Sequence, residues 1–315
     1  MKILDCTIRD GGYVNNWDFD IRFVGKLAQA LQAANVDYIE LGFVDPRQTP
    51  KDKDFSNLSE ETINIIKEEY GITTPIAAMV NCYEGLSYDV NKLPKNIDLL
   101  RIATHYDTYE TALLSALYSD VAQAAVNFMG ISNYNDEQLK EILRHAYEYK
   151  RRINYYYVAD SFGACTPKTL LHIFNIIEEH FGTPRQFGFH PHDNISCAFA
   201  NTLAALDSGA GIVDSSVLGM GRGAGNLKTE LLIGYLEQQQ YNYSVLPVLE
   251  FIDNEMFRIT DRHTWGLNSY QMLSGLMSTH PNYATKFRQH NGYSLVEAYK
   301  EIRALSPTQR KHFKA

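Results

Sequence analysis

The chain has 315 residues, 45% of them hydrophobic and 21% charged, which is ordinary for a globular protein and fits one large α/β barrel or two medium domains. Its formal net charge of -8, with no basic block to offset it, argues against a nucleic-acid partner, and no apolar run is long enough to span a bilayer. Four widely spaced cysteines without a CxxC pair, and a first strand with no secretory signal before it, predict reduced thiols in a cytoplasmic protein.

Short apolar runs typical of buried strands alternate along the chain with longer segments that have helical periodicity. The predicted strands are residues 3–7, 38–43, 75–80, 99–104, 122–129, 153–159, 186–189 and 211–218. The predicted helices are residues 20–34, 59–69, a weak short one near 88, then 109–118, 136–149, 167–180, 195–208 and 227–239. Residues 9–18, which are rich in glycine and asparagine, are expected to form a loop.

This order gives eight strand–helix units of roughly 30 residues each, which predicts a (β/α)8 TIM barrel. The runner-up is a doubly wound open sheet, but its first strand–helix turn would carry a dinucleotide-binding glycine pattern that this chain lacks. Residues 1–240 are therefore expected to form a catalytic barrel. Residues 241–315 are expected to form a helical extension, broken at Pro247, Pro281 and Pro307, that packs on the barrel or on a partner subunit.

Two histidines, His190 and His192, stand where the seventh strand ends. Because side chains alternate between the faces of a strand, both imidazoles are expected on one face, and Pro191 marks where strand pairing ends. Asp193 or Asn194 can then cap the following helix. Two histidines at this spacing are by themselves a weak signal for a functional site.

A charged pair, Arg9 and Asp10, follows the first strand in the same way. In a closed barrel the first and seventh strands both flank the eighth, and their C-terminal ends open at the same mouth. Asp10, His190 and His192 can therefore converge. One carboxylate and two neutral imidazoles are typical ligands of a divalent metal, and they leave coordination positions open to a substrate.

Three segments in this order, residues 7–11 (TIRDG), 190–194 (HPHDN) and 219–226 (GMGRGAGN), resemble motifs of the DRE-TIM metallolyase superfamily. Its members include HMG-CoA lyase, isopropylmalate and homocitrate synthases, and 4-hydroxy-2-oxovalerate aldolase. The aldolase branch matches best, because residues 101–105 (RIATH) and 159–164 (ADSFGA) resemble its fourth-strand and sixth-strand motifs. The resemblance covers about residues 1–235 and fades in the tail.

The resemblance implies a metal site made by Asp10, His190 and His192, with Asn226 of the glycine-rich turn as a further oxygen ligand. Mn2+ is the first choice of metal. Mg2+, Co2+ or Zn2+ stay open, because mixed nitrogen and oxygen ligation does not select sharply among these cations.

The resemblance also implies roles for four other side chains. Arg9 would stabilise the enolate oxygen of a substrate, and Ser161 would hydrogen-bond to the substrate carboxylate. The alternatives are a structural salt bridge across the barrel mouth for Arg9 and a turn-forming hydroxyl for Ser161. Glu40 and His105 are expected to face the mouth from the second and fourth strands, where either can instead orient Arg9 or another ligand.

The chain departs from the aldolase branch three residues after Asp10, where that branch has a histidine taken to be the base and this sequence has Tyr13. The ordinary pKa of tyrosine is about 10, against about 6.5 for histidine, so Tyr13 is a poor base at neutral pH unless the metal or Arg9 lowers its pKa. Tyr13 could instead bind substrate, while His105 or a metal-bound water takes the proton, or it could pack in a lid loop.

The C-terminal tail contains two tyrosines, Tyr270 and Tyr283, that could match the tyrosine closing over the site in the aldolase branch. Aromatic core packing is the alternative for each. Members of that branch pass acetaldehyde to a partner dehydrogenase through this tail, and no such partner is assumed here because the tail is short and divergent. A homo-oligomer, specifically a dimer, is expected.

Together these features predict a metal-dependent, class II aldolase that cleaves or forms a C–C bond between pyruvate, or a similar 2-oxo acid, and an aldehyde. The alternatives are an acyl-CoA condensing transferase related to isopropylmalate and homocitrate synthases, or an HMG-CoA lyase-like enzyme. The cysteine that HMG-CoA lyase uses in its glycine-rich turn is missing from residues 219–226. A non-haem iron oxygenase and a binding protein without activity are further alternatives.

Overall fold

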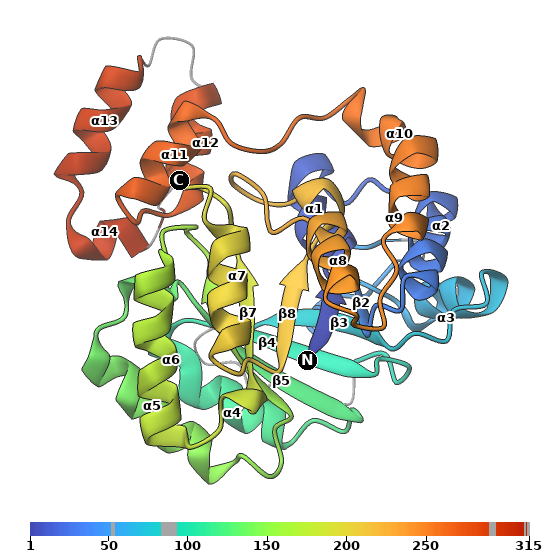
Figure 1. Ribbon diagram of the computed structural model, residues 1–315, viewed down its shortest axis with the longest axis horizontal. Coiled ribbons are helices and arrows are strands. Elements are labelled where there is room, and N and C mark those ends of the chain that lie inside the picture. Colours follow the sequence, from blue (N-terminus) through green and yellow to red (C-terminus); the bar gives the residue numbers. More distant parts are fainter. Residues whose placement is uncertain (52–53, 83–92, 290–293, 312, 314–315) are drawn as a thin grey trace.

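The computed structural model describes residues 1–51, 54–82, 93–289, 294–311 and 313, and shows a closed barrel of eight parallel strands (Figure 1). The strands are β1 Lys2–Asp5, β2 Tyr38–Phe43, β3 Ile76–Asn81, β4 Leu99–Thr104, β5 Gln123–Met129, β6 Tyr155–Asp160, β7 Phe187–Pro191 and β8 Ile212–Ser215. They are neighbours in chain order, and β1 pairs with β8 to close the sheet. The (β/α)8 prediction is therefore confirmed.

The helices around the barrel follow the predicted ranges closely. They are α2 Ile21–Ala33, α3 Glu60–Glu69, α4 Tyr109–Leu117, α5 Asp136–Glu148, α6 Pro167–Phe181, α7 Ala198–Asp207 and α8 Thr229–Gln238. Local chemistry sets their starts, since the side chains of Asp20, Ser59, Asn135 and Thr166 each accept a hydrogen bond from a backbone N–H in the first turn. The short helix predicted near residue 88 lies outside the described residues.

One prediction is wrong: most of the segment expected to be a loop forms helix α1, Thr7–Asn15. The helix begins directly after β1, and the carboxylate of Asp5 accepts a hydrogen bond from the N–H of Thr7 at 2.9 Å. The glycines that suggested a loop serve close packing instead. A Cβ on Gly12 would lie 2.1 Å from the indole of Trp17, so no larger residue fits there.

The tail contains α9 Leu246–Phe251, a π-helical turn at Ile252–Met256, α10 Phe257–Thr260, α11 Ser269–Leu276, α12 Pro281–Gln289, α13 Leu295–Ala304 and α14 Pro307–Lys311. The three prolines expected to break the helical tail each lie where a new helix begins, in the first turns of α9, α12 and α14. Proline is tolerated there because the first N–H groups of a helix have no partner within it.

Two groups of helices in the tail lie at different sides of the barrel. Helix α9 packs beside α2, whereas α11 to α14 form a group of their own near the start of α7 (Figure 1). The side-chain amide of Asn194, after β7, donates hydrogen bonds to the carbonyl of Gln271 at 3.1 Å and to Ser274 Oγ at 3.3 Å. These bonds fix α11 over the C-terminal mouth of the barrel. The division at residue 240 stays a prediction.

Side chains inside the barrel form distinct layers. The lower part holds a compact apolar cluster made of Leu4, Cys6, Tyr38, Ala77, Leu99, Ala125, Tyr157 and Ile212. Above it lie buried charged side chains, and the mouth is partly apolar again at Phe43, Met79 and Ala103. No helix in the described part of the chain has both the length and the apolar character needed to cross a membrane.

Candidate active site

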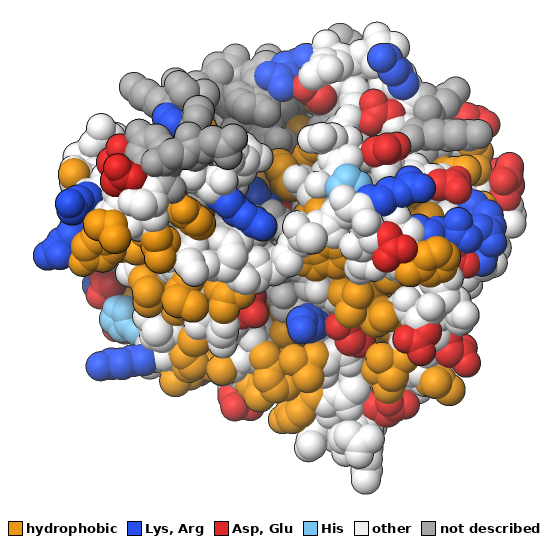
Figure 2. Space-filling model, turned by 90° about the horizontal axis from the view of Figure 1, so that it is seen from above, with side chains coloured by type: hydrophobic (Ala, Val, Ile, Leu, Met, Phe, Trp, Pro, Cys, Tyr) orange, Lys and Arg blue, Asp and Glu red, His pale blue; other side chains and the backbone are white. Residues whose placement is uncertain are grey.

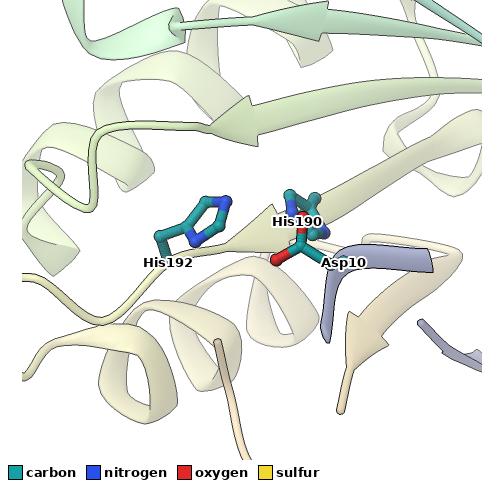
Figure 3. A group of neighbouring side chains, drawn as sticks. All are labelled: Asp10, His190 and His192. Carbon is teal, nitrogen blue, oxygen red and sulfur yellow. The ribbon is translucent and has the colours of Figure 1, made fainter. Parts of the chain in front are cut away.

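Three predicted metal ligands meet at the mouth of the barrel. Asp10 lies on α1, His190 is the fourth residue of β7, and His192 follows that strand. Figure 3 shows the Asp10 carboxylate beside His190, with His192 farther along the same segment. Each residue offers one ligand atom that lies within 4.8 Å of the other two, and all three residues are buried. One cation could therefore contact all three side chains.

Each imidazole is held through its Nδ1 atom. His190 Nδ1 lies 2.9 Å from Asp214 Oδ2, and His192 Nδ1 lies 3.2 Å from the carbonyl oxygen of Gly225. When Nδ1 carries the proton and donates it to these oxygens, Nε2 keeps its lone pair for a metal. Two fixed imidazoles with Nε2 available are what a metal site needs.

The electrostatic environment keeps His192 and Asp10 in their ligating forms. Burial, together with the neighbouring His190, Arg222 and Arg9, outweighs the effect of Asp10 and lowers the pKa of His192 to about 3, so its imidazole is neutral. Burial alone would raise the pKa of Asp10, but Arg9 and then the two histidines lower it below its usual range. At neutral pH the site therefore offers a carboxylate and a neutral imidazole.

Asn226 reaches the same place from the glycine-rich turn after β8. Its Nδ2 donates to Asp10 Oδ2 at 2.8 Å, and its Oδ1 is buried with no hydrogen-bond partner among the described residues. A Cβ on Gly221 would lie 2.4 Å from Asn226 Nδ2 and 2.5 Å from Asp10 Oδ2, so this approach requires glycine. The unpaired amide oxygen suits a further ligand of a hard cation.

A chain of ion pairs below the site connects two of the proposed ligands. Arg9 donates to Asp10 at 2.6 Å and to Glu40 at 2.8 Å. Glu40 also accepts from Arg101 at 2.9 Å, and Arg101 reaches Asp214, which holds His190. This chain of ion pairs fixes Asp10 and His190, two of the proposed ligands, relative to each other.

Arg101 and Asp214 are functional candidates that sequence reasoning missed. Both interrupt strands that are otherwise mostly apolar, and both are fully buried. A charged residue at an inward-facing position of a barrel strand was the available signal. Its partners could not be inferred, because Arg101 and Asp214 lie 113 residues apart in the chain.

The cavity above this chain has a volume of about 40 Å³ and is lined by Arg9, Asp10, both histidines, Ser161 and other side chains. The Nη2 atom of Arg9 is buried and has no partner among the described residues. Ser161 Oγ accepts a hydrogen bond from the N–H of Gly130 at 3.1 Å. Asn127, which sequence reasoning also missed, lines the cavity with a buried, unpaired Oδ1. The cavity thus offers a few polar groups to a small molecule.

Tyr13 and Arg222 stand at the rim of this cavity. The ring of Tyr13 packs edge-on against Trp17 and Phe43, with centroid distances of 4.7 and 6.1 Å, and 44% of the residue is exposed. The guanidinium carbon of Arg222 lies 5.7 Å from the centre of the Tyr13 ring. Arg222 is a further residue that sequence reasoning did not single out.

The other predicted site residues lie deeper or farther away. Glu40 is fully buried and contacts Arg9 and Arg101. His105 lines a separate cavity of about 230 Å³ between the barrel and the end of the chain. Tyr270 packs on α11 against the apolar cluster that contains Leu273 and Phe287. The structure therefore brings together Arg9, Asp10, Tyr13, Ser161, His190, His192 and Asn226, with Glu40 directly behind Arg9.

Comparison with known proteins adds independent observations. The family model described as HMGL-like matches residues 98–254. A 4-hydroxy-2-oxovalerate aldolase of Geobacillus thermodenitrificans is 30% identical over 245 residues, which cover 75% of this chain and 69% of the relative. The enzyme of that name from Carboxydothermus hydrogenoformans is 27% identical over 269 residues, covering 79% and 76%.

Two solved structures share this fold. The N-terminal domain of a candidate aldolase from Bacteroides vulgatus superposes with a TM-score of 0.80 at 28% identity, covering 95% of this chain and all of that domain. An HMG-CoA lyase from Brucella melitensis has a TM-score of 0.65 at 16% identity, with coverage of 83% and 98%. At that identity the lyase shows a shared fold and no more.

Proposed function

The chain belongs to the HMGL-like family of carbon–carbon lyases, and we propose that it is a divalent-metal-dependent aldolase acting between pyruvate, or a similar 2-oxo acid, and an aldehyde. The aldolase-like role follows from the relatives. The metal requirement, the substrates and the residue roles are the proposal. The metal-ligand group beside the unpaired Nη2 of Arg9 is the observation that carries it.

Asp10, His190 and His192 would hold the cation, with Asn226 Oδ1 as a further ligand. When bound there, a divalent cation would act as a Lewis acid on the carbonyl of the 2-oxo acid. Mn2+ is proposed first, and Mg2+, Co2+ and Zn2+ stay open, because mixed nitrogen and oxygen ligation does not select sharply among these cations.

Arg9 has the contacts expected of a group that stabilises negative charge on the substrate. Glu40 and Asp10 accept hydrogen bonds from Nε and Nη1, which fixes the plane of the guanidinium, and Nη2 has no partner among the described residues. When the C3–C4 bond of the substrate breaks, its electron pair forms the enolate of the 2-oxo acid. Arg9 Nη2 would donate a charge-assisted hydrogen bond to that enolate oxygen.

The proton of the substrate hydroxyl must leave before that bond breaks. Tyr13 stands at the rim of the cavity, so we assign to it the contact with this hydroxyl. His105, in the neighbouring cavity, is the competing acceptor of the proton. Ser161 Oγ, held by the N–H of Gly130, would bind the substrate carboxylate. C–C cleavage by the Tyr13→Phe and His105→Asn variants would show whether the reaction uses the Tyr13 hydroxyl or the His105 imidazole.

The direct test follows exchange of deuterium into the methyl group of pyruvate by NMR, with Mn2+ supplied and then removed by a chelator. Exchange reports enolate formation and requires no knowledge of the aldehyde. We expect exchange that depends on the metal. Absence of exchange at saturating metal, together with consumption of an acyl-CoA thioester, would replace this proposal with the condensing-transferase or HMG-CoA lyase-like alternative. The homodimer and the cytoplasmic location stay predictions.

A further inference from the structure

A second and larger cavity adjoins the proposed active site. Its volume is about 390 Å³, against about 40 Å³ for the inner cavity. Tyr13, Gly221 and Arg222 form its barrel side, and residues of α11 and α12 form the opposite side. Since Tyr13 and Arg222 also line the inner cavity, the two spaces meet at these side chains. Figure 2 looks down on the molecule from above and shows a central hollow with positively charged side chains beside it.

The charged side chains described in the lining of this outer cavity are all positive. Its lining includes Arg222 and Arg288 and, among the described residues, no aspartate or glutamate. The remaining polar lining consists of uncharged donors and acceptors, namely Thr264, Gln271, Asn282, Thr285 and Gln289. Two guanidinium groups around a polar cavity attract an anion, and guanidinium matches the geometry of a carboxylate or a phosphate.

Arg222 is fixed in place but not fully paired. Its backbone N–H donates to Asp10 Oδ2 at 3.1 Å, and its Nη2 donates to the carbonyl oxygen of Ser161 at 3.4 Å. Its Nε is buried and has no partner among the described residues. A buried donor on a cation is costly to leave unpaired, and a ligand that supplies an acceptor would remove that cost.

The inner cavity is small. Its volume of about 40 Å³ corresponds to a few water molecules, because one water needs roughly 10–15 Å³. This leaves little space beyond the 2-oxo acid, and we place the part of the substrate that comes from the aldehyde past Tyr13 and Arg222, in the outer cavity.

We propose that the aldehyde-derived part of the substrate carries an anionic group, a carboxylate or a phosphate, that binds to Arg222 and Arg288 in the outer cavity. This inference rests on the proposed aldolase function and names the class of its second substrate. The anionic group takes no part in the bond changes. The C–C bond forms between the methyl carbon of pyruvate and the aldehyde carbon, and the proton lost from the methyl group balances the one gained by the new hydroxyl.

The test compares three aldehydes as partners for pyruvate: propanal, succinic semialdehyde and glycolaldehyde phosphate. We expect kcat/KM to be at least tenfold higher for one of the two anionic aldehydes than for propanal, and their comparison distinguishes a carboxylate from a phosphate. Arg222→Met and Arg288→Gln should each reduce that preference about tenfold, with partial recovery in Arg222→Lys. Arg144→Gln on α5, which removes an exposed arginine outside the cavity, is the matched control and should leave the preference as it is.

Two further measurements separate this inference from the proposed function. Deuterium exchange into pyruvate, recorded on the same preparations, tests the aldolase half-reaction without an aldehyde. Calorimetric titration with succinate and with inorganic phosphate tests the anion site without turnover, and binding should weaken at least fivefold in Arg222→Met. Exchange that persists while propanal is the preferred aldehyde would overturn the inference alone. Anion binding that Arg222→Met and Arg288→Gln leave unchanged would also overturn it, whatever the exchange shows.

Discussion

The lower and upper parts of the barrel interior differ sharply although the same eight strands form both. The lower part is packed with apolar side chains such as Leu4, Leu99 and Ile212. The upper part holds buried charges, and several of its polar atoms have no partner among the described residues, including Glu40 Oε1, Arg101 Nε and Asp214 Oδ1. Unpaired buried polar atoms cost stability, so their concentration at one end marks the end that was shaped by function.

The largest expected effect tests whether the upper part is a metal site. Asp10→Ala or His190→Ala should abolish metal retention and reduce activity at least about a thousandfold, because each removes one of three clustered ligand atoms. Metal content after dialysis, measured by mass spectrometry, checks this. Leu99→Ala in the lower part is the control and should keep its metal. Full metal retention in both ligand variants would place the cation elsewhere.

The next effect separates the metal from the chemistry. Arg9→Ala should keep the metal but reduce deuterium exchange into pyruvate about 10²–10³-fold, since it removes the donor proposed to stabilise the developing negative charge. The same preparation should be assayed for metal content and for exchange. An Arg9→Ala variant with unreduced exchange would end the assignment of the enolate to this residue.

A third prediction compares the loss of stability caused by one substitution in each part of the barrel interior. Arg101→Met should lower the free energy of unfolding by about 3–5 kcal/mol, because Glu40 and Asp214 lose their shared cation in the barrel interior. Leu99→Ala should cost a similar amount, about 2–5 kcal/mol, through the cavity that it leaves. Only Arg101→Met should also weaken metal binding, by about 10- to 100-fold, since Asp214 then no longer holds His190 in the same way. Denaturant unfolding and metal titration of both variants check this contrast.

The smallest expected effect concerns the pH dependence of stability and involves Asp5, which lies just outside the barrel interior. Burial raises the pKa of Asp5 from 3.8 to about 6, despite its hydrogen bonds from Thr229 and Thr7. Between these two values the folded protein holds a proton that the unfolded chain has lost, so this group makes stability fall as the pH rises from about 4 to about 6. Asp5→Asn should flatten that part of the curve of unfolding free energy against pH. An unchanged slope would contradict the raised pKa.

Periodicity and capping were sufficient to predict the strands and most helices, because those signals are local. Helix α1 was missed because Gly11 and Gly12 disfavour helix by their intrinsic propensity, whereas close packing of Met220 against Gly11 and of Trp17 against Gly12 favours it in the fold. Asp10, His190 and His192 could be brought together from sequence because barrel topology alone places strand ends at one mouth.

The surroundings of those ligands could not be predicted in the same way. The path from Arg9 on α1 through Glu40 and Arg101 to Asp214 depends on which inward positions of three strands share one level, and strand register is not readable from a single sequence. Arg222 was not predicted as a site residue because it lies in a glycine-rich turn, and the glycines of such a turn indicate only a close approach of the backbone. Its importance depends on a cavity formed with α12, far along the chain.

The closure of the barrel between β1 and β8 has a consequence for how the protein is made. Asp10 emerges from the ribosome early, yet its partner Asn226 is 216 residues farther along the chain. Contacts of such high sequence separation form late and slowly, since the intervening loop must be ordered first. The proposed metal ligands therefore converge only after synthesis of the last strand is complete, so a cation bound by all of them would report that the whole barrel has folded.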